Sequence, residues 1–115
     1  MGFRRVPAEL SAALSSDRSG WAVVSLSGGF DDLDTGVALS ALLFELISEG
    51  NRVVSVDARW VSALGPTASR GLVAAAELLE DSGGLLVLSG LRLQLRLVVQ
   101  VFDERSCVHL TRIRR

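Results

Sequence analysis

The sequence predicts an α/β fold in which helices cover a mixed β-sheet that begins with an N-terminal β-hairpin. Short valine- and leucine-rich runs, which are typical of strands, alternate with longer stretches whose apolar residues recur at helical spacing. Glycine-containing turns separate these segments, and no repeat or low-complexity tract interrupts the series. A chain of 115 residues is expected to form a single domain around one core.

The first twenty residues leave two structures open. Phe3 and Val6 could begin an edge strand, whereas Ala8–Leu14 is equally compatible with a helix. Ser15–Gly20 has the serine, aspartate and glycine that are typical of a turn. If a strand precedes this turn, it forms an antiparallel hairpin with the strand that follows.

That following strand is predicted over Trp21–Ser27, because the segment contains β-branched valines, and Gly28-Gly29 is expected to end it. A helix is then predicted from Asp34, its expected N-cap, to a stop at Gly50. Its apolar face consists of Leu39, Leu42, Leu43 and Leu46. Arg52–Asp57 is predicted to be the next strand, and a strand, helix and strand in this order form a parallel βαβ unit.

After a loop, a second helix is predicted over Pro66–Glu80, since proline is favoured in the first turn of a helix. Leu85–Leu88 is an unbroken apolar run, which predicts a strand buried on both faces. A third helix is predicted over Arg92–Phe102 and a short last strand over Cys107–Leu110. The residues of the third helix expected to face inward are Leu97, Val98, Val101 and Phe102.

Clusters of polar residues favour structural roles over chemistry. Asp31, Asp32 and Asp34 crowd the start of a helix, where carboxylates cap the backbone and interact with the helix dipole. Cys107 and His109 alternate on a predicted strand and are expected on one face, but two ligands alone do not make a zinc site. We therefore expect no metal site.

Asp57 follows a predicted strand, which is where α/β proteins often place ligands. A phosphate-accepting aspartate of the response-regulator kind would need an acidic pair and a lysine as well, and the chain contains no lysine. No serine, histidine or glycine-rich loop has the spacing of a catalytic or phosphate-binding motif. We therefore expect no enzymatic activity, no catalytic residue and no cofactor.

Charge and hydropathy narrow the choice of partner and location. The net charge is -1, and the only basic cluster, Arg112–Arg115, is expected to be a solvated tail, so nucleic acid is not an expected partner. Val37–Ile47, the longest apolar stretch, is too short to span a bilayer, and the N-terminus lacks the apolar core of a signal peptide. With Cys107 as the single cysteine, a reducing cytoplasm is the expected location.

Three segments resemble the STAS domain family, which includes bacterial anti-sigma factor antagonists. VVSLSGGFD (Val23–Asp31) resembles its opening strand and turn, and VVSVDARWVSALGPTASRGL (Val53–Leu72) its central strand, loop and second helix. SGGLLVLSG (Ser82–Gly90) is similar to its next turn and strand. The resemblance covers a core of about residues 21–110, leaves 111–115 as a basic tail, and implies a single STAS-like domain.

The resemblance also marks a departure from the family. Antagonists of this kind carry Asp-Ser-Ser-Gly at the start of the second helix, and the first serine accepts phosphate from a kinase that is also the anti-sigma factor. Here the segment is Gly65-Pro66-Thr67-Ala68, so the acceptor position is Pro66, which has no hydroxyl. Thr67, one residue on, is the remaining phosphoacceptor candidate.

A helix entrance presents unpaired N–H groups and a positive dipole end, which suit a docking site. Together with the resemblance, this predicts a partner-binding surface made of Asp31, Ala63, Gly65, Pro66, Thr67, Ser69 and Arg70. The implied partner is an anti-sigma factor or a kinase-type regulator, whose sequestration would free a sigma factor.

Four alternatives stay open. The chain could be a structural or regulatory subunit of a larger assembly, such as a stressosome or a lipid-transport ATPase complex. It could bind a small molecule or nucleotide, it could have kept the fold with a drifted loop, and it could form a homodimer.

Overall fold

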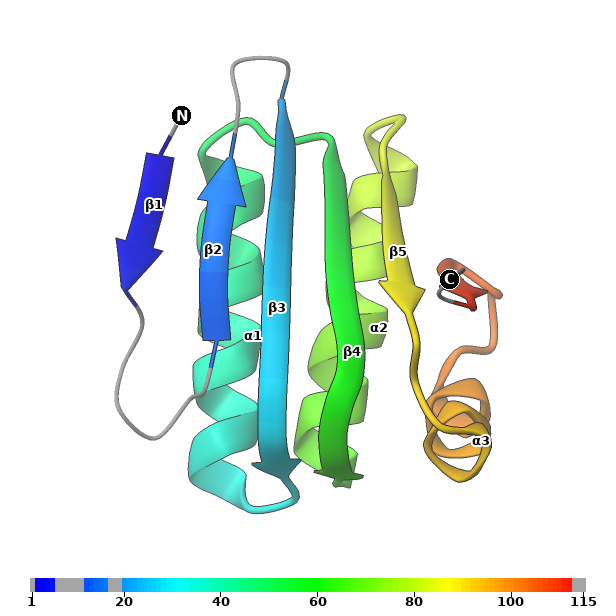
Figure 1. Ribbon diagram of the computed structural model, residues 1–115. Helices are drawn as coiled ribbons and strands as arrows, with labels where there is room; N and C mark the ends of the chain where they lie inside the picture. Colours follow the sequence, from blue (N-terminus) through cyan, green and yellow to red (C-terminus); the bar gives the residue numbers. More distant parts are fainter. Residues whose placement is uncertain (1, 6–11, 17–19, 113–115) are drawn as a thin grey trace.

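A six-stranded mixed sheet forms one layer of the protein, and helices lie behind it (Figure 1). The computed structural model describes residues 20–112 and the backbone of residues 2–5 and 12–16. In chain order the elements are β1 (Gly2–Arg5), β2 (Ala12–Ser16), β3 (Trp21–Phe30), α1 (Leu33–Ser48), β4 (Val53–Leu64), α2 (Pro66–Asp81), β5 (Leu85–Ser89), α3 (Leu93–Phe102) and β6 (Val108–Thr111).

The strands lie side by side in the order in which they occur in the chain, from β1 to β6. The first two pairings, β1 with β2 and β2 with β3, are antiparallel, and the pairings from β3 through β6 are parallel. Each parallel pairing is joined by a crossover helix, and right-handed crossovers that advance in one direction place their helices on the same face. The α/β class, the mixed sheet and the N-terminal hairpin are therefore confirmed.

The N-terminal segment is a strand pair rather than a helix. Phe3 lies in β1, and Ala12, which the helical alternative included, lies in β2 together with Ser15, which was expected in a turn. Pairing with β3 explains this, because β2 joins an existing sheet edge. Val6 and residues 8–11 and 17–19 fall outside the described residues.

β3 and β4 run further than the sequence predicts. Gly28-Gly29 does not end β3, because Gly29 still pairs with Ala63 on β4 and Phe30 pairs with Leu64. The expected loop after Asp57 is strand as well, so Asp57 lies in the middle of β4 and not at its end. Gly28 has φ +92° at a shift in register, so the glycine accommodates an irregularity within the ladder.

The N-cap of helix α1 lies two residues earlier than expected. Its N-cap is Asp32, whose side chain accepts a hydrogen bond of 2.7 Å from the Thr35 N–H, and Asp34 lies in the first turn instead. The reason is geometric, because a cap must lie two or three residues before the N–H that it accepts. The predicted inward residues are confirmed as core: Leu39, Leu42, Leu43 and Leu46 are all buried.

The face that α3 turns inward agrees with the prediction at Phe102 but not at Leu97 and Val101. Leu97 and Val101 are 54% and 74% exposed, whereas Val99 is buried. Leu95 and Phe102 are the partly buried apolar residues of this helix that pack against the core. Because seven of the ten residues of this helix are apolar, spacing alone could not select its buried side.

The two last strands also differ in detail from the prediction. In β5, Leu86 and Leu88 are buried, but Leu85 and Val87 are only half-buried because the sheet has no helix on their side. The last strand begins at Val108, one residue later than expected. Among the described residues, none of the helices has the length and hydropathy needed to cross a bilayer.

Helices α1 and α2 approach each other closely at two glycines. A Cβ on Gly36 would lie 2.7 Å from the Cβ of Thr67 and 2.9 Å from the backbone nitrogen of Ala68. A Cβ on Gly71 would first meet the hydroxyl oxygen of Ser40 and then its Cβ at 3.1 Å. Each helix therefore contributes one glycine to the contact, and the two helices fix each other's position.

We predict that Gly36→Ala destabilises the protein by about 1–2 kcal/mol, although alanine is the better helix former by about 1 kcal/mol. The added methyl group would meet a backbone nitrogen and a branched side chain, and neither can turn aside. Urea unfolding at neutral pH measures the change.

Gly71→Ala is the matched control for this change. Its nearest neighbour is the Ser40 hydroxyl, which can rotate to another rotamer, so the loss should be smaller. A Gly36→Ala protein as stable as the unchanged chain would show that the helices can move apart freely.

Candidate functional site

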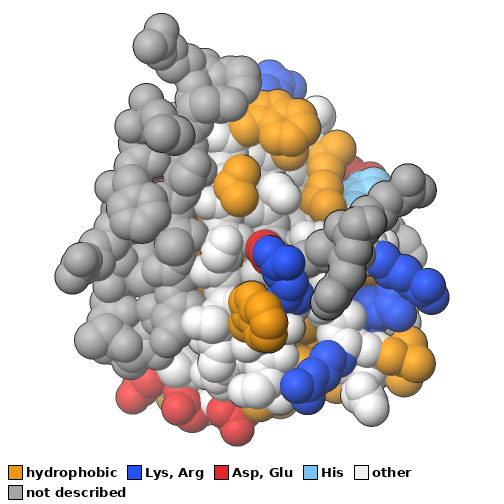
Figure 2. Space-filling view, viewed as in Figure 1, with side chains coloured by type: hydrophobic (Ala, Val, Ile, Leu, Met, Phe, Trp, Pro, Cys, Tyr) orange, Lys and Arg blue, Asp and Glu red, His pale blue; other side chains and the backbone are white. Residues whose placement is uncertain are grey.

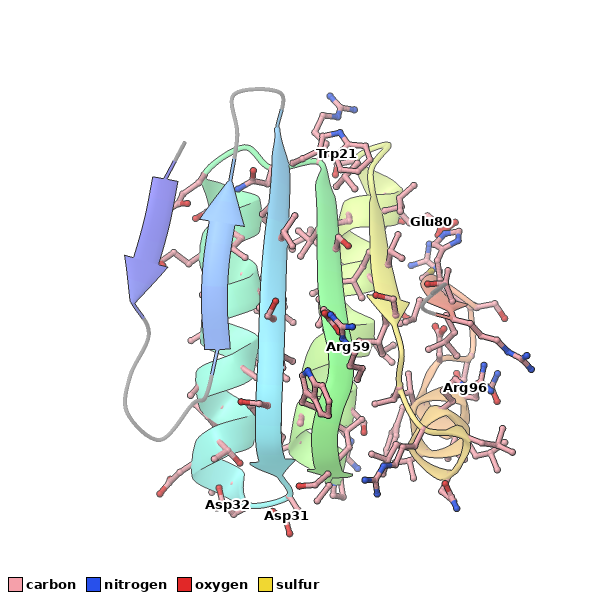
Figure 3. The ribbon with its side chains drawn as sticks, viewed as in Figure 1. Trp21, Asp31, Asp32, Arg59, Glu80 and Arg96 are labelled. Atoms are coloured by element: carbon pink, nitrogen blue, oxygen red, sulfur yellow. The ribbon has the colours of Figure 1, made fainter. Side chains whose placement is uncertain are left out.

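The candidate site lies at the end of the sheet where β3 and β4 finish and α2 begins. Gly65 is the N-cap of α2, and its N–H donates to the carbonyl oxygen of Phe30 at 2.9 Å. The chain between β3 and α1 therefore lies beside the first turn of α2, and Figure 3 shows Asp31 and Asp32 at this end of the molecule. This backbone hydrogen bond thus joins the β3–α1 loop to the start of α2, the two segments that contain most of the predicted surface residues.

Gly65 has a steric requirement at this contact. A Cβ at this position would lie 2.9 Å from the carbonyl oxygen of Asp31 and 3.0 Å from its Cα. Both are backbone atoms, which cannot move away without displacing the loop. The structure therefore explains why glycine occupies the position at which the resemblance expects aspartate.

The seven predicted surface residues divide by exposure. Asp31, Pro66 and Arg70 are exposed, and Ala63 and Thr67 are half-buried. Gly65 and Ser69 are buried, and the Ser69 hydroxyl has no hydrogen-bond partner among the described residues. Since Ser69 lies one turn into α2 on its inner side, its side chain does not reach the surface, and its place in the predicted set is corrected.

Thr67 is half-buried because of its contact with α1. Its Cβ and methyl carbon are the atoms that a Cβ on Gly36 would meet at 2.7 and 2.8 Å. Its backbone lies in the first turn of α2, directly after Pro66. A phosphate on Thr67 would add about two negative charges within the turn where the helix dipole is positive.

Arg70 ties α2 to α3 through an aromatic ring. Its guanidinium carbon lies 5.2 Å from the centroid of the Phe102 ring, a distance at which a cation is attracted by the ring face. The side chain nevertheless remains exposed. Its positive charge is therefore held in a restricted position next to the helix entrance.

Of the aspartates at this end, Asp32 caps α1. Asp32 accepts hydrogen bonds from the Thr35 N–H at 2.7 Å and from the Thr35 hydroxyl at 2.8 Å. The first of these bonds, followed by the second, holds the pKa of the Asp32 carboxyl below its usual value of 3.8. Across residues 20–112, no group of three acidic, histidine or cysteine side chains is arranged to hold a metal ion.

Cys107 and His109 do not share a face, so that prediction is wrong. Cys107 is buried just before β6, whereas His109 is exposed on the strand. Burial raises the pKa of the Cys107 thiol, which keeps it protonated and unreactive at neutral pH. The carboxyl of Asp103 orders this segment by accepting the N–H groups of Cys107 and Val108, both at 2.9 Å.

Arg59 and Trp60 are exposed residues that the sequence analysis did not single out. Arg59 lies 3.0 Å from the Asp57 carboxylate, and its guanidinium carbon lies 6.0 Å from the Trp60 ring centroid. The signal was present as an arginine–tryptophan pair directly after a valine-rich strand. The pair was not singled out because it was expected in a loop, where exposed side chains are ordinary.

Comparison with solved structures places the fold. The anti-sigma factor antagonist SpoIIAA from Bacillus, in its unphosphorylated form, is 15% identical, with a TM-score of 0.71 over 91% of this chain and 89% of that one. An anti-sigma factor antagonist from Mycobacterium paratuberculosis is 23% identical, with a TM-score of 0.64 over 87% and 85%.

A sulfate transporter family protein from Wolinella succinogenes is 22% identical, with a TM-score of 0.60 over 83% of this chain and 80% of that one. No protein-family model matches the sequence, and no curated protein sequence matches it. The fold is therefore that of the STAS domain, as the sequence resemblance implied.

We predict that Asp32→Ala lowers the melting temperature at pH 7 and that this loss disappears in acid. Because the pKa of Asp32 is depressed in the folded state, its contribution is fully present above the unfolded pKa of 3.8 and is lost as the pH falls through the lower folded value. Thermal unfolding between pH 7 and pH 2 measures both variants.

Asp34→Ala is the control, since it removes a carboxylate from the same turn but no cap. Equal losses in the two variants at pH 7 would mean that general charge near the helix, and not the cap, accounts for the effect.

Proposed function

We propose that this protein is a non-enzymatic docking module that acts as an anti-sigma factor antagonist and binds an anti-sigma factor or a kinase-type regulator. The surface that we assign to this contact, the docking surface, consists of Asp31, Ala63, Pro66, Thr67 and Arg70, with Gly65 beneath it. The observation that carries the proposal is the backbone hydrogen bond from Gly65 to Phe30, which holds the start of α2 and the β3–α1 loop together.

The chemistry of the docking surface suits a protein partner. The first turn of α2 has no side-chain cap, so its positive end is available to an acidic group of the partner. Pro66 offers a rigid apolar contact, and Arg70 offers a charge positioned by Phe102. Binding would sequester the regulator and free a sigma factor, so the protein would regulate transcription in a bacterial cytoplasm without nucleic-acid binding or membrane insertion.

Pro66 removes the usual phosphorylation switch. A phosphate at the first position of the helix would add about two negative charges to the centre of the docking surface and disturb a packed interface. Proline cannot accept a phosphate, so the module would remain competent to bind at all times. Control would then come from the amount of protein present, or from Thr67.

A structural or regulatory subunit of a larger assembly is the second candidate. It is favoured by the absence of a hydroxyl at Pro66, because a permanent subunit needs no switch. The similarity to a sulfate transporter family protein also supports it, since a protein of that description has a similar fold. Neighbouring genes separate the two cases: a histidine-kinase-like ATPase supports the first, and transport permeases support the second.

We predict that Arg70→Glu weakens binding to the partner by about tenfold or more, because it places a negative charge where the positive one is held. The partner would first be captured from the native cell with the unchanged protein, and its affinity for both forms would then be measured by calorimetry. Circular dichroism confirms that the variant is folded.

Arg105→Glu is the matched control, because Arg105 pairs with Asp81 at the opposite end of α2 at 2.8 Å. An exposed ion pair of this kind contributes little to stability. If both variants bind alike, net charge and not the docking surface determines affinity, and the proposed surface is wrong.

Incubation with the partner kinase and ATP tests the altered switch. We predict that Pro66→Ser becomes phosphorylated at the new serine. In the unchanged protein Thr67 is the acceptor candidate in this turn, because the other hydroxyl, that of Ser69, is buried. Mass spectrometry identifies the site, and Thr67→Val provides the control. An unmodified Thr67 would exclude it as an acceptor for that kinase.

A further inference from the structure

Helix α3 carries a second apolar row on its outer side. A surface helix ordinarily has one apolar stripe, which faces the core. In α3, buried Val99 and partly buried Phe102 belong to that stripe. Leu93, Leu97 and Val101 form the second row, spaced four residues apart, and each is more than half exposed. The outer row extends over about 12 Å of the helix axis and does not contribute to the core of this chain.

Two arginines lie along one edge of the outer row. Arg92 is the N-cap of α3, and Arg96 lies one turn further on. Like charges at this spacing repel each other, and the helix dipole disfavours cations at a helix start. No acidic residue of α3 offsets them, because the helix contains none. Local rules that are broken in this way are typical of functional surfaces.

Neither arginine side chain has an acceptor in the part of the chain that the structure describes. The ion pairs found there are Arg59 with Asp57 and Arg105 with Asp81. The side chain of Arg96 is half-buried, and its Nε is buried without a hydrogen-bond partner. Figure 3 shows Arg96 at the right-hand edge of the molecule, on α3. Both guanidinium groups are therefore suited to receive a carboxylate from another molecule.

The outer side of α3 adjoins the docking surface. α3 packs against α2, and Arg70 of the docking surface lies 5.2 Å from the ring of Phe102 at the end of α3. In Figure 2, arginine and apolar side chains lie together at the lower right, over α3, and acidic side chains gather at the lower left, below α1. This end of the molecule is therefore acidic towards α1 and basic towards α3.

We propose that the partner covers α3 with an acidic amphipathic helix. The surface that it would cover, the α3 face, consists of Leu93, Leu97, Val101, Arg92 and Arg96. Rows of side chains four residues apart are the ridges by which helices most often pack together, so an apolar row on the partner helix fits the outer row. Carboxylates along one edge of that helix would pair with the two arginines.

This inference rests on the proposed function, because it assigns the α3 face to the same partner as the docking surface. It adds the chemistry of the partner: apolar residues at helical spacing with acidic residues on one side of them. The α3 face thereby extends the contact beyond the first turn of α2.

An anionic membrane is the other surface that a basic amphipathic helix could contact. The positions of the charges favour a partner helix. At 100° per residue, Arg92 and Arg96 fall on the same edge of the outer row, and Gln94 lies on the opposite edge. A helix that lies flat on a charged plane is favoured by cations on both edges, whereas one cationic edge matches one acidic edge of a neighbouring helix.

Two synthetic peptides test this chemistry on the full chain. The acidic probe is a helix of about 18 residues, long enough to be helical in water, with leucines at helical spacing and glutamates along one edge. The basic probe has lysines in place of the glutamates. We expect calorimetry to give at least about tenfold tighter binding of the acidic probe. Backbone amide NMR shifts should change most along α3.

Arg92→Glu tests the cationic edge. We expect it to weaken binding of the acidic probe about tenfold or more and to strengthen binding of the basic probe. Glutamate at a helix start is favoured by the helix dipole, so a loss of binding would not reflect a loss of the helix. Arg59→Glu is the control, because it makes the same change in net charge on the sheet face opposite the helices.

Leu97→Ser tests the outer row. It should weaken binding of the acidic probe about tenfold or more, because it removes a central apolar contact. Val37→Ser is the matched control, since Val37 is 53% exposed on α1 and Leu97 is 54% exposed on α3. Equal effects of the two substitutions would show that exposed apolar area in general, and not the α3 face, binds the probe.

Four results would overturn the proposal. These are no binding of the acidic probe at concentrations up to about 1 mM, equal binding of the two probes, amide shifts confined to elements other than α3, and Arg92-dependent binding to phosphatidylserine vesicles without binding of the acidic probe.

The captured partner separates this inference from the proposed function. If Arg70→Glu weakens binding to the partner while Arg92→Glu and Leu97→Ser do not, the docking surface is supported and the α3 assignment is wrong. If only the two α3 variants weaken it, the α3 assignment is supported and the docking surface is wrong. If none of the three does, both proposals fail.

Discussion

The rest of the structure depends on the close approach of α2 to α1 and to the loop that precedes α1. The contact has no room for side chains: Gly36 faces Thr67, Gly65 faces the backbone of Asp31, and Gly71 faces Ser40. Because these neighbours include backbone atoms, they set the distance between the segments more strictly than apolar packing could. The hydrogen bond from Gly65 to Phe30 then fixes where the helix entrance lies relative to the sheet.

This constraint acts at one end of the molecule and not on the sheet face opposite the helices. At the rigid end, the cap of Asp32, the joint at Gly65 and the Arg70–Phe102 contact connect α1, α2 and α3. The sheet face opposite the helices depends on none of these contacts, because β3 and β4 are joined directly by the hydrogen bonds of their parallel pairing.

The sequence predicted best where local rules and tertiary contacts agree. Pro66 marked the start of α2, and a regular apolar spacing marked the core face of α1. The sequence-based prediction failed where pairing between strands outweighed a local signal. A glycine such as Gly28 ordinarily ends a strand, but here Gly28 continues to pair with β4. The buried side of α3 could not be read from a nearly uniform apolar helix. Of the candidate site, the segments were predicted, but the inward position of Ser69 depends on helix rotation within the fold.

The energetics of the helix entrance bear on Gly65 and Pro66, the two positions at which the sequence resemblance expects aspartate and serine. Glycine as N-cap costs only a few tenths of a kcal/mol relative to a polar cap, and proline at the first helical position stabilises by about 0.4–1 kcal/mol through the unfolded state. Gly65 and Pro66 together therefore leave the stability of α2 almost unchanged. The stability of α2 therefore does not account for this pair of residues, and under the proposed function their effect is on the docking surface.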